Sequence, residues 1–465
     1  MDGAKDNLIV KASYSTVRSG IIRLTPESIQ CRLYCRGANC KYCSCKHWKA
    51  SEQAIRGIYS SWITDKIVAM ARPTTETFIN YNFIGQLKEM NIRTIINMQT
   101  AGEHAFCGPA LLPSGFTYDP EVLMENKIYF YNFDWPDFGA LGLELLLNVV
   151  KVMHFATSEG NVAVHCHAGL GRTGVIVASY LVWRYQLSSA EAINYVRKKR
   201  PHSVQSSTQI ELINAFWYFL LNDARVIPRR GVLSLCDYLQ LQGKVLCNSE
   251  ARRYNHIPKI VHLIRTALLE TIFSQSDMAE MGSQQKSAEV YQRCESHCDT
   301  GLGECSKYFG LKRKISSTEI AKQLCILMKQ ENDANMDFEL DGSLASGSFN
   351  MVNTKAFVEK RMRGRVHFAF YALHRFMLSL KKPIASQHNI IRSFCSGSET
   401  PMEAWQCLLY TLLNLMSLVC HENCNTAAQL LTLWYTGEIA HEVSAQIDSY
   451  LQRLLHLQRT TCDKV

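Results

Sequence analysis

The most informative stretch of the sequence is Val162-Ala163-Val164-His165-Cys166-His167-Ala168-Gly169-Leu170-Gly171-Arg172-Thr173-Gly174. Its apolar start predicts a buried strand, and the apolar run beyond Thr173 predicts a helix that ends near Tyr185. The glycines between them permit a tight loop. Backbone N–H groups of a loop that opens a helix, together with the positive helix terminus, form a cradle for an anion the size of a phosphate.

Reactive side chains lie at both ends of this loop. We expect Cys166 to be a nucleophile, because the positive field of the cradle favours its thiolate. Arg172 follows six residues later, and its planar guanidinium suits two phosphoryl oxygens and the transition state. We expect the Thr173 hydroxyl to help the sulfur leave in a second step, and His165 to orient the loop. The predicted substrate-binding residues of the loop are His167, Ala168, Gly169, Leu170 and Gly171. A buried structural cysteine is the alternative, but it leaves the glycines and the arginine unexplained.

The segments around the loop alternate between apolar strands and helical patterns. This order is typical of an α/β domain whose central, mostly parallel sheet is covered by helices on both faces. The expected elements are strands at 66–71, 94–98, 127–131 and 161–165, and helices at 75–90, 143–159 and 173–185.

The whole chain is expected to contain five regions. These are a basic, cysteine-rich segment at 1–50, a catalytic domain at 51–225, a helical extension at 226–275, a polar linker at 276–350 and an all-helical region at 351–465. The apolar stretch at 404–420 is interrupted by polar residues and falls short of the ~20 residues that a membrane span needs. We therefore expect a buried helix there and no transmembrane segment.

Composition narrows the class of protein. The chain has 465 residues, 47% hydrophobic and 20% charged, which excludes a wholly disordered protein. Its net charge of +9 fits an anionic ligand without requiring nucleic acid, and we expect none as a partner. The first six residues lack the apolar core of an export signal, so we expect the 18 cysteines to be reduced thiols in the cytoplasm.

The pattern His-Cys-x5-Arg-Thr at 165–173 resembles the signature of the cysteine-dependent protein tyrosine phosphatases. Residues 133–139 resemble the mobile Trp-Pro-Asp loop of that family. This resemblance implies that Asp137, or alternatively Asp134, protonates the leaving oxygen and later deprotonates the attacking water. Residues 200–209 resemble a loop of the cell-division-cycle-fourteen-like group, which implies that Gln209, or Gln205, positions that water. A simple helix cap at 207–208 explains the same residues equally well.

Further stretches resemble the same dual-specificity-like group, namely 54–65, 69–73, 94–97, 102–108 and 128–133. The resemblance covers residues 31–215. It implies the cysteine-phosphatase fold, a phosphoprotein substrate and a role in cilium formation or maintenance. We expect the reaction to need no cofactor or metal, because the loop and Arg172 supply the positive charge.

The substrate class follows from what the site lacks. No Asn-Arg-Tyr run that deepens the pocket of tyrosine-specific enzymes is present, which favours a cleft that admits phosphoserine and phosphothreonine as well as phosphotyrosine. His167 and Leu170 occupy positions where phosphoinositide phosphatases carry lysines, so we expect a protein substrate. Two alternatives stay open: a phosphoinositide phosphatase, and a catalytically weak scaffold that binds phosphoproteins and recruits a protein partner through its C-terminal helices.

The cysteine-rich segment contains Cys31, Cys35, Cys40, Cys43, Cys45 and His47. Four thiolate or imidazole ligands suffice for zinc, but this spacing is not that of a standard finger. We expect reduced thiols packed against the catalytic domain, with zinc as the alternative.

Overall fold

The computed structural model describes residues 10–14, 21, 24–137, 141–273, 315–329, 350–387, 389–390, 403–420, 424–438 and 441–462. The chain divides into two units, Met1–Leu220 and Leu221–Val465. The polar linker expected at 276–350 lies outside the described residues, except for 315–329 and 350.

One mostly parallel sheet forms the centre of the first unit, with the strand order β1-β2-β5-β3-β4. The strands are β1 (Ser60–Trp62), β2 (Ile67–Met70), β3 (Ile92–Asn97), β4 (Tyr129–Asn132) and β5 (Asn161–His165). All neighbouring strands are parallel except β1, which pairs antiparallel with β2. Strand β2 is wholly buried and β5 nearly so, as expected of apolar strands that are covered on both faces. The expected α/β fold is confirmed, whereas the short, polar edge strand β1 was not predicted.

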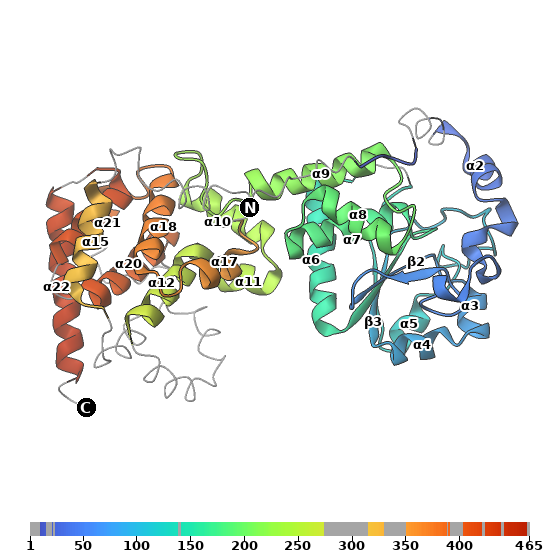
Figure 1. Cartoon of the computed structure of the whole chain (residues 1–465), viewed down its shortest axis with the longest axis horizontal. Helices are drawn as coiled ribbons and strands as arrows, with labels where there is room; N and C mark the ends of the chain where they lie inside the picture. The colour runs from blue at the N-terminus through green and yellow to red at the C-terminus, as the bar shows by residue number, and fades with distance from the viewer. Residues whose placement is uncertain are drawn as a thin grey trace, which may run out of the picture. The chain divides into compact units, whose positions relative to one another are not determined.

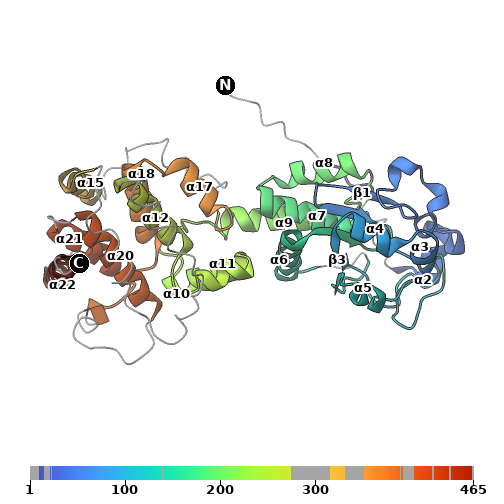
Figure 2. The same ribbon diagram turned by 90° about the horizontal axis from the view of Figure 1, so that it is seen from below.

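Helices cover the two faces of this sheet (Figures 1 and 2). Helices α6 (Leu143–Glu159) and α7 (Gly171–Tyr185) pack on one face, and α4 (Phe83–Glu89) lies on the other. The other α-helices with described bounds in the first unit are α2 (Glu27–Tyr34), α3 (Thr75–Asn80), α5 (Glu121–Glu125), α8 (Ser189–Lys199) and α9 (Ser207–Asn222), and four short 3-10 helices follow α2 between Gly37 and Glu52.

The prediction of one continuous helix over 75–90 is wrong. Helix α3 ends at Asn80, and Asn82 adopts a left-handed conformation with φ of 48°. Its side chain accepts a hydrogen bond from the N–H of Gly85 at 3.3 Å and so begins α4. Asparagine tolerates this backbone conformation and is a preferred helix cap, so a local interaction interrupts an apolar pattern that would otherwise continue.

The second unit is helical in its described part. Its helices are α10 (Leu235–Val245), α11 (Asn248–Arg253), α12 (Lys259–Ile272), α15 (Ser317–Lys329), α17 (Thr354–Arg361), α18 (Val366–Ser379), α20 (Ala404–Cys420), α21 (Cys424–Thr436) and α22 (His441–Cys462). The apolar stretch 404–420 forms α20, and Leu408, Leu412 and Met416 are buried on it. None of the helices that the structure describes is both long and apolar enough to cross a membrane.

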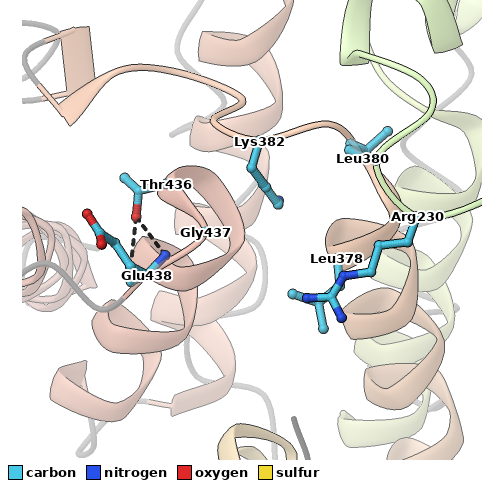
Figure 3. A pocket seen from close by; sticks show the side chains of 8 residues that line it. Arg230, Leu378, Leu380, Lys382, Thr436, Gly437 and Glu438 are labelled. Carbon is cyan, nitrogen blue, oxygen red and sulfur yellow. Dashed lines mark hydrogen bonds between the residues drawn. The ribbon is translucent and has the colours of Figure 1, made fainter.

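A pocket of about 390 Å³ opens in the second unit (Figure 3). It lies between the segment at Arg230, the end of α18 and the turn after α21, and it brings together the charged residues Arg230, Lys382 and Glu438. The Thr436 hydroxyl caps that turn by accepting a hydrogen bond from the N–H of Glu438 at 3.4 Å. None of the site residues predicted from the sequence lines this pocket.

Candidate active site

The predicted nucleophile follows directly after the central strand of the sheet. Strand β5 ends at His165 and α7 begins at Gly171, so residues 166–170 form the loop between them. Cys166 is 4% exposed. The carboxyl end of a strand in an open α/β sheet is the usual place for a ligand, and here it also faces the N-terminus of a helix.

The carbonyl groups of this loop are bound from outside it. The carbonyl oxygen of His167 accepts from the N–H of Arg72 at 3.0 Å, and that of Leu170 accepts from the N–H of Val204 at 3.1 Å. The Arg200 guanidinium donates to the carbonyl oxygens of Ala168 at 3.1 Å and Gly169 at 2.6 Å. In a trans peptide the next N–H points away from the carbonyl. The N–H groups of residues 168–171 are therefore turned to the opposite side, where they can bind an anion.

Arg172 is held in place by Glu103. The carboxylate accepts hydrogen bonds from Nη1 at 2.8 Å and from Nη2 at 2.6 Å, and Nη1 also donates to the carbonyl oxygen of Trp135 at 2.6 Å. Burial alone would lower the pKa of Arg172, but Asp137 and Glu103 raise it, so the guanidinium stays charged. Its Nε makes no hydrogen bond in the described part of the chain.

Asp137 is the candidate acid that reaches this centre. Its Oδ1 lies 3.4 Å from Arg172 Nε and its Oδ2 lies 3.3 Å from His104 Nε2, while one third of the side chain is exposed. Burial raises the pKa of Asp137, but the Arg172 charge and the His104 hydrogen bond outweigh it and hold the pKa below its ordinary value. Asp134, the alternative, is exposed and accepts a hydrogen bond from the Thr100 hydroxyl. The structure thus brings Asp137 to Arg172, and it places Asp134 at the surface.

His165 and Thr173 are both fully buried. His165 Nδ1 lies 3.1 Å from the carbonyl oxygen of Cys166, and its Nε2 lies 2.8 Å from the Tyr118 hydroxyl. Burial lowers the pKa of His165 to about 3, so the ring is neutral, with Nδ1 as the donor and Nε2 as the acceptor. It therefore fixes the backbone of the nucleophile. Thr173 Oγ1 has no hydrogen-bond partner among the described residues.

The side chain of His167 contacts the cysteine-rich segment. Its Nε2 lies 3.4 Å from Cys40 Sγ, and its ring stacks on His104 with the centroids 3.9 Å apart. Burial lowers the pKa of His167 to about 3, and the charge of His104 adds to this effect. His167 thus offers no positive charge to a substrate, although its carbonyl shapes the loop.

Both candidate glutamines border the loop at Gly171. A Cβ on Gly171 would lie 2.8 Å from Gln209 Nε2 and 3.4 Å from Gln205 Oε1. Gln209 Oε1 accepts from the N–H of Gln205 at 2.8 Å, so its amide nitrogen is the end that faces Gly171. The start of α9 is capped by Ser206, whose hydroxyl accepts from the N–H of Gln209 at 3.2 Å, and not at 207–208.

Sequence reasoning missed three charged residues of the site, namely Arg72, Glu103 and Arg200. Arg72 and Arg200 are at most 1% exposed. Arg200 also lies over the Tyr59 ring at 3.8 Å, and Arg72 Nη2 donates to the carbonyl oxygen of His104 at 3.1 Å. The available signal was chemical, because a buried catalytic arginine needs a fixed carboxylate partner and buried carbonyls need donors.

Comparisons with known proteins match this part of the chain to phosphatases. Residues 77–217 match the family described as "Dual specificity phosphatase, catalytic domain". The protein named "Protein tyrosine phosphatase domain-containing protein 1" from Danio rerio is 44% identical over 274 residues, which are 58% of this chain and 38% of that protein. The protein of the same name from Bos taurus is 46% identical over 268 residues, 55% of this chain and 33% of its own length. The chain thus spans less than two fifths of the curated relatives that it matches.

A more distant relative is the "Tyrosine-protein phosphatase cdc-14" of Caenorhabditis elegans, 41% identical over 138 residues, which are 23% of this chain and 19% of that protein. The solved structure described as "Crystal structure of Tk-PTP in the active form" is 22% identical with a TM-score of 0.29, and the match covers 34% of this chain and 96% of that one. Residues 77–217 thus match the catalytic domain of the dual-specificity phosphatases, and this stretch contains Cys166 and Arg172.

Proposed function

We propose that this chain is a phosphomonoesterase that hydrolyses phosphotyrosine, phosphoserine and phosphothreonine in proteins. The observation that carries the proposal is the phosphate loop itself. Four consecutive carbonyls are bound from outside, so four N–H groups are free to face an anion between Cys166 and Arg172. Such preorganised donors stabilise a transferring phosphoryl group without reorganisation.

In the proposed mechanism the Cys166 thiolate attacks phosphorus while Arg172 and the loop N–H groups bind the equatorial oxygens. Asp137 protonates the leaving oxygen, and a cysteinyl-phosphate forms. Asp137 then deprotonates a water that Gln209, or Gln205, positions, and the Thr173 hydroxyl stabilises the departing sulfur. None of these steps is assigned to a metal or cofactor, because the guanidinium and the loop supply the positive charge.

The protonation state of Asp137 follows from its contacts. Without a bound anion, the Arg172 charge holds the pKa of Asp137 low. A phosphate bound to Arg172 would neutralise that field, so the same carboxyl would gain a proton when the substrate enters. The approach of Asp137 to Arg172 Nε at 3.4 Å therefore links substrate binding to the readiness of the acid.

The surroundings of His167 favour a protein substrate over an inositide. A headgroup with several phosphates needs cations around the loop, whereas the His167 imidazole is neutral and packed against Cys40 and His104, and Leu170 is buried. We therefore rank the phosphoinositide alternative second. Phosphate release from phosphopeptides compared with phosphoinositides separates the two.

Turnover of an aryl phosphate by the purified full chain tests the proposal. We expect Cys166→Ser to abolish hydrolysis, and Asp137→Ala to lower kcat by about 10²- to 10⁴-fold, the usual contribution of a general acid. Asp134→Ala is the matched control, since its carboxylate is exposed, and should retain activity. Equal rates for the wild type and a folded Cys166→Ser variant would instead favour a phosphoprotein-binding scaffold.

The cellular role is proposed from the resemblance alone. We propose that the chain acts in the cytoplasm in cilium formation or maintenance, and that its C-terminal helices bind a protein partner. Replacement of the protein by Cys166→Ser in ciliated cells tests whether hydrolysis supports that role. Normal cilia in such cells would contradict it.

A further inference from the structure

Thiols and imidazoles from three segments gather beside the phosphate loop. Cys31, Cys40 and Cys107 are at most 1% exposed and form one buried cluster, with Cys35 and Cys43 packed against it. His104 and His167 border the cluster, with His104 Nδ1 3.6 Å from Cys31 Sγ and 3.7 Å from Cys107 Sγ. Thiols are weak hydrogen-bond donors and acceptors. Hydrogen bonding between them therefore does not explain why several thiols are buried side by side here.

The candidate ligands fall into two groups that share His167. The ligand atoms of Cys35, His104, Cys107 and His167 all lie within 4.8 Å of one another, and so do those of Cys40, Cys43 and His167. Cys40 Sγ lies 3.4 Å from His167 Nε2 and contacts the sulfurs of Cys35 and Cys107. Zinc ligands at about 2.0–2.3 Å in a tetrahedron stand roughly 3.5–3.8 Å from each other, so small side-chain movements would complete the geometry.

We propose that Cys35, Cys40, Cys107 and His167 bind a structural Zn²⁺ ion. Three thiolates and one imidazole in a closed tetrahedral shell are a donor set that zinc prefers. This departs from the expectation of metal-free thiols drawn from the sequence. Two of the four ligands lie far along the chain from the cysteine-rich segment, so the spacing within that segment could not reveal the set.

His104 is better placed as a partner of the ligands than as a ligand. Its ring is stacked on His167 at an interplanar angle of 15°, and lone pairs in two stacked, nearly parallel rings cannot converge on one ion. Its Nε2 faces Asp137 Oδ2 at 3.3 Å, while its Nδ1 faces Cys107 Sγ. His104 therefore connects the thiolate side of the zinc site to the candidate acid, as outer-shell groups commonly do.

The backbone already joins the two sides of the proposed site. The N–H of Gly108 donates to the carbonyl oxygen of Gly37 at 3.1 Å, and a Cβ on Gly108 would meet Cys43 Cβ at 2.4 Å. Arg72 contributes positive charge nearby, because its Nη2 donates to the carbonyl oxygens of His104 and Cys107. The zinc would fasten the cysteine-rich segment to the phosphate loop at the residue that follows Cys166.

Metal analysis of the full chain tests this proposal without any activity assay. Protein expressed with added zinc and purified without chelator should contain about one zinc per chain by mass spectrometry of the elements. Cobalt titration of the metal-free chain should give a thiolate-to-cobalt charge-transfer band that zinc abolishes. The proposal would be overturned if the chain took up neither zinc nor cobalt. It would also be overturned if the purified chain contained iron in place of zinc.

Variants identify the ligands. Cys35→Ser and Cys107→Ser should lose the zinc, whereas Cys31→Ser and Cys43→Ser should keep it. Cys236→Ser is the matched control, since Cys236 is exposed on α10. Circular dichroism checks that each variant folds. If a variant does not fold, the cobalt spectrum of the wild-type chain still tests whether thiolates bind the metal. Retention of zinc by folded Cys35→Ser and Cys107→Ser variants would contradict the assignment.

The result is separable from the proposed function. Cys166→Ser removes the nucleophile but none of the four ligands, so it should be inactive and still contain one zinc. Loss of the zinc in that variant, while it remains folded, would show that the metal sits on the nucleophile and would overturn the proposal.

Discussion

Arg172 shows how one fixed side chain depends on another. Its guanidinium is 1% exposed and donates two hydrogen bonds to the Glu103 carboxylate, so its position is set before any anion arrives. Burying a charge costs free energy unless the charge is paired, and the two-point contact with Glu103 supplies the partner. This contact uses Nη1 and Nη2 and leaves Nε to face Asp137. Glu103 is therefore a positioning residue for the proposed chemistry.

Glu103→Gln should lower kcat/KM for an aryl phosphate by about 10- to 100-fold, because a small displacement of a positioning group has effects of this size. The isosteric amide removes the carboxylate charge without opening a cavity. Steady-state kinetics measure the change, and Glu89→Gln, at an exposed position of α4, is the control. Unchanged kinetics for a folded Glu103→Gln variant would show that Arg172 does not need this partner.

His374 in the second unit should make stability depend on pH. Its Nδ1 accepts a hydrogen bond from Trp434 Nε1 at 2.9 Å. Burial lowers its pKa to about 4, and the facing charges of Arg375, Lys382 and Arg230 add to this. Between pH ~6.5 and about 4 the unfolded state binds the proton that the folded state excludes, so stability falls as the pH falls.

The measurement for His374 is the free energy of unfolding against pH. We expect the wild-type chain to lose up to about 1.4 kcal/mol per pH unit more than His374→Asn across this window, since asparagine can accept the same bond but does not titrate. Circular dichroism at 222 nm follows the unfolding of the helices. Parallel pH profiles for the two proteins would contradict a neutral, buried His374.

At the scale of elements, the phosphate loop fits against the strand beside β5. Gly169 has a φ of +66°, and a Cβ there would lie 1.9 Å from the carbonyl oxygen of Met70 at the end of β2. The loop can therefore approach the sheet only because this residue has no side chain. The requirement arises from the pairing of β2 with β5, which brings Met70 beside His165.

Gly169→Ala should destabilise the first unit by at least about 3 kcal/mol, since strain and a backbone clash coincide. Gly142→Ala, where nothing lies within 4 Å of the added Cβ, should change stability by less than about 1 kcal/mol. Thermal unfolding compares the two. A Gly169→Ala protein as stable as the Gly142→Ala protein would mean that the loop does not pack on β2 in this way.

At the scale of the whole molecule, all the proposed catalytic residues lie in the first unit, Met1–Leu220. Helix α9 ends at Asn222, so a chain that stops at residue 225 keeps every element that carries a proposed catalytic residue. We expect this shorter chain to fold and to hydrolyse an aryl phosphate with the kcat/KM of the full chain. A folded but inactive product, judged by circular dichroism and kinetics, would show that the second unit takes part in catalysis.

The sequence by itself predicted the elements whose pattern is local and strong. Strand 161–165, helix 143–159 and the buried helix at 404–420 have the predicted bounds, because apolar periodicity and flanking glycine or polar residues specify them. It also predicted the loop between β5 and α7, since strand, glycines and helix are contiguous there. The chemistry of Cys166 and Arg172 stays a prediction.

Only the tertiary structure decided what meets that loop. The break at Asn82 depends on one side-chain cap, and the edge strand β1 depends on pairing with β2. Neither feature can therefore be recognised from a pattern of apolar residues in the sequence. The hydrogen bonds that Arg172 donates to Glu103 join residues from separate segments, and so do the contacts of Cys107 with Cys35 and Cys40. A local pattern encodes an element's own periodicity, whereas these contacts exist because the sheet order β2-β5-β3 brings distant chain segments to one edge.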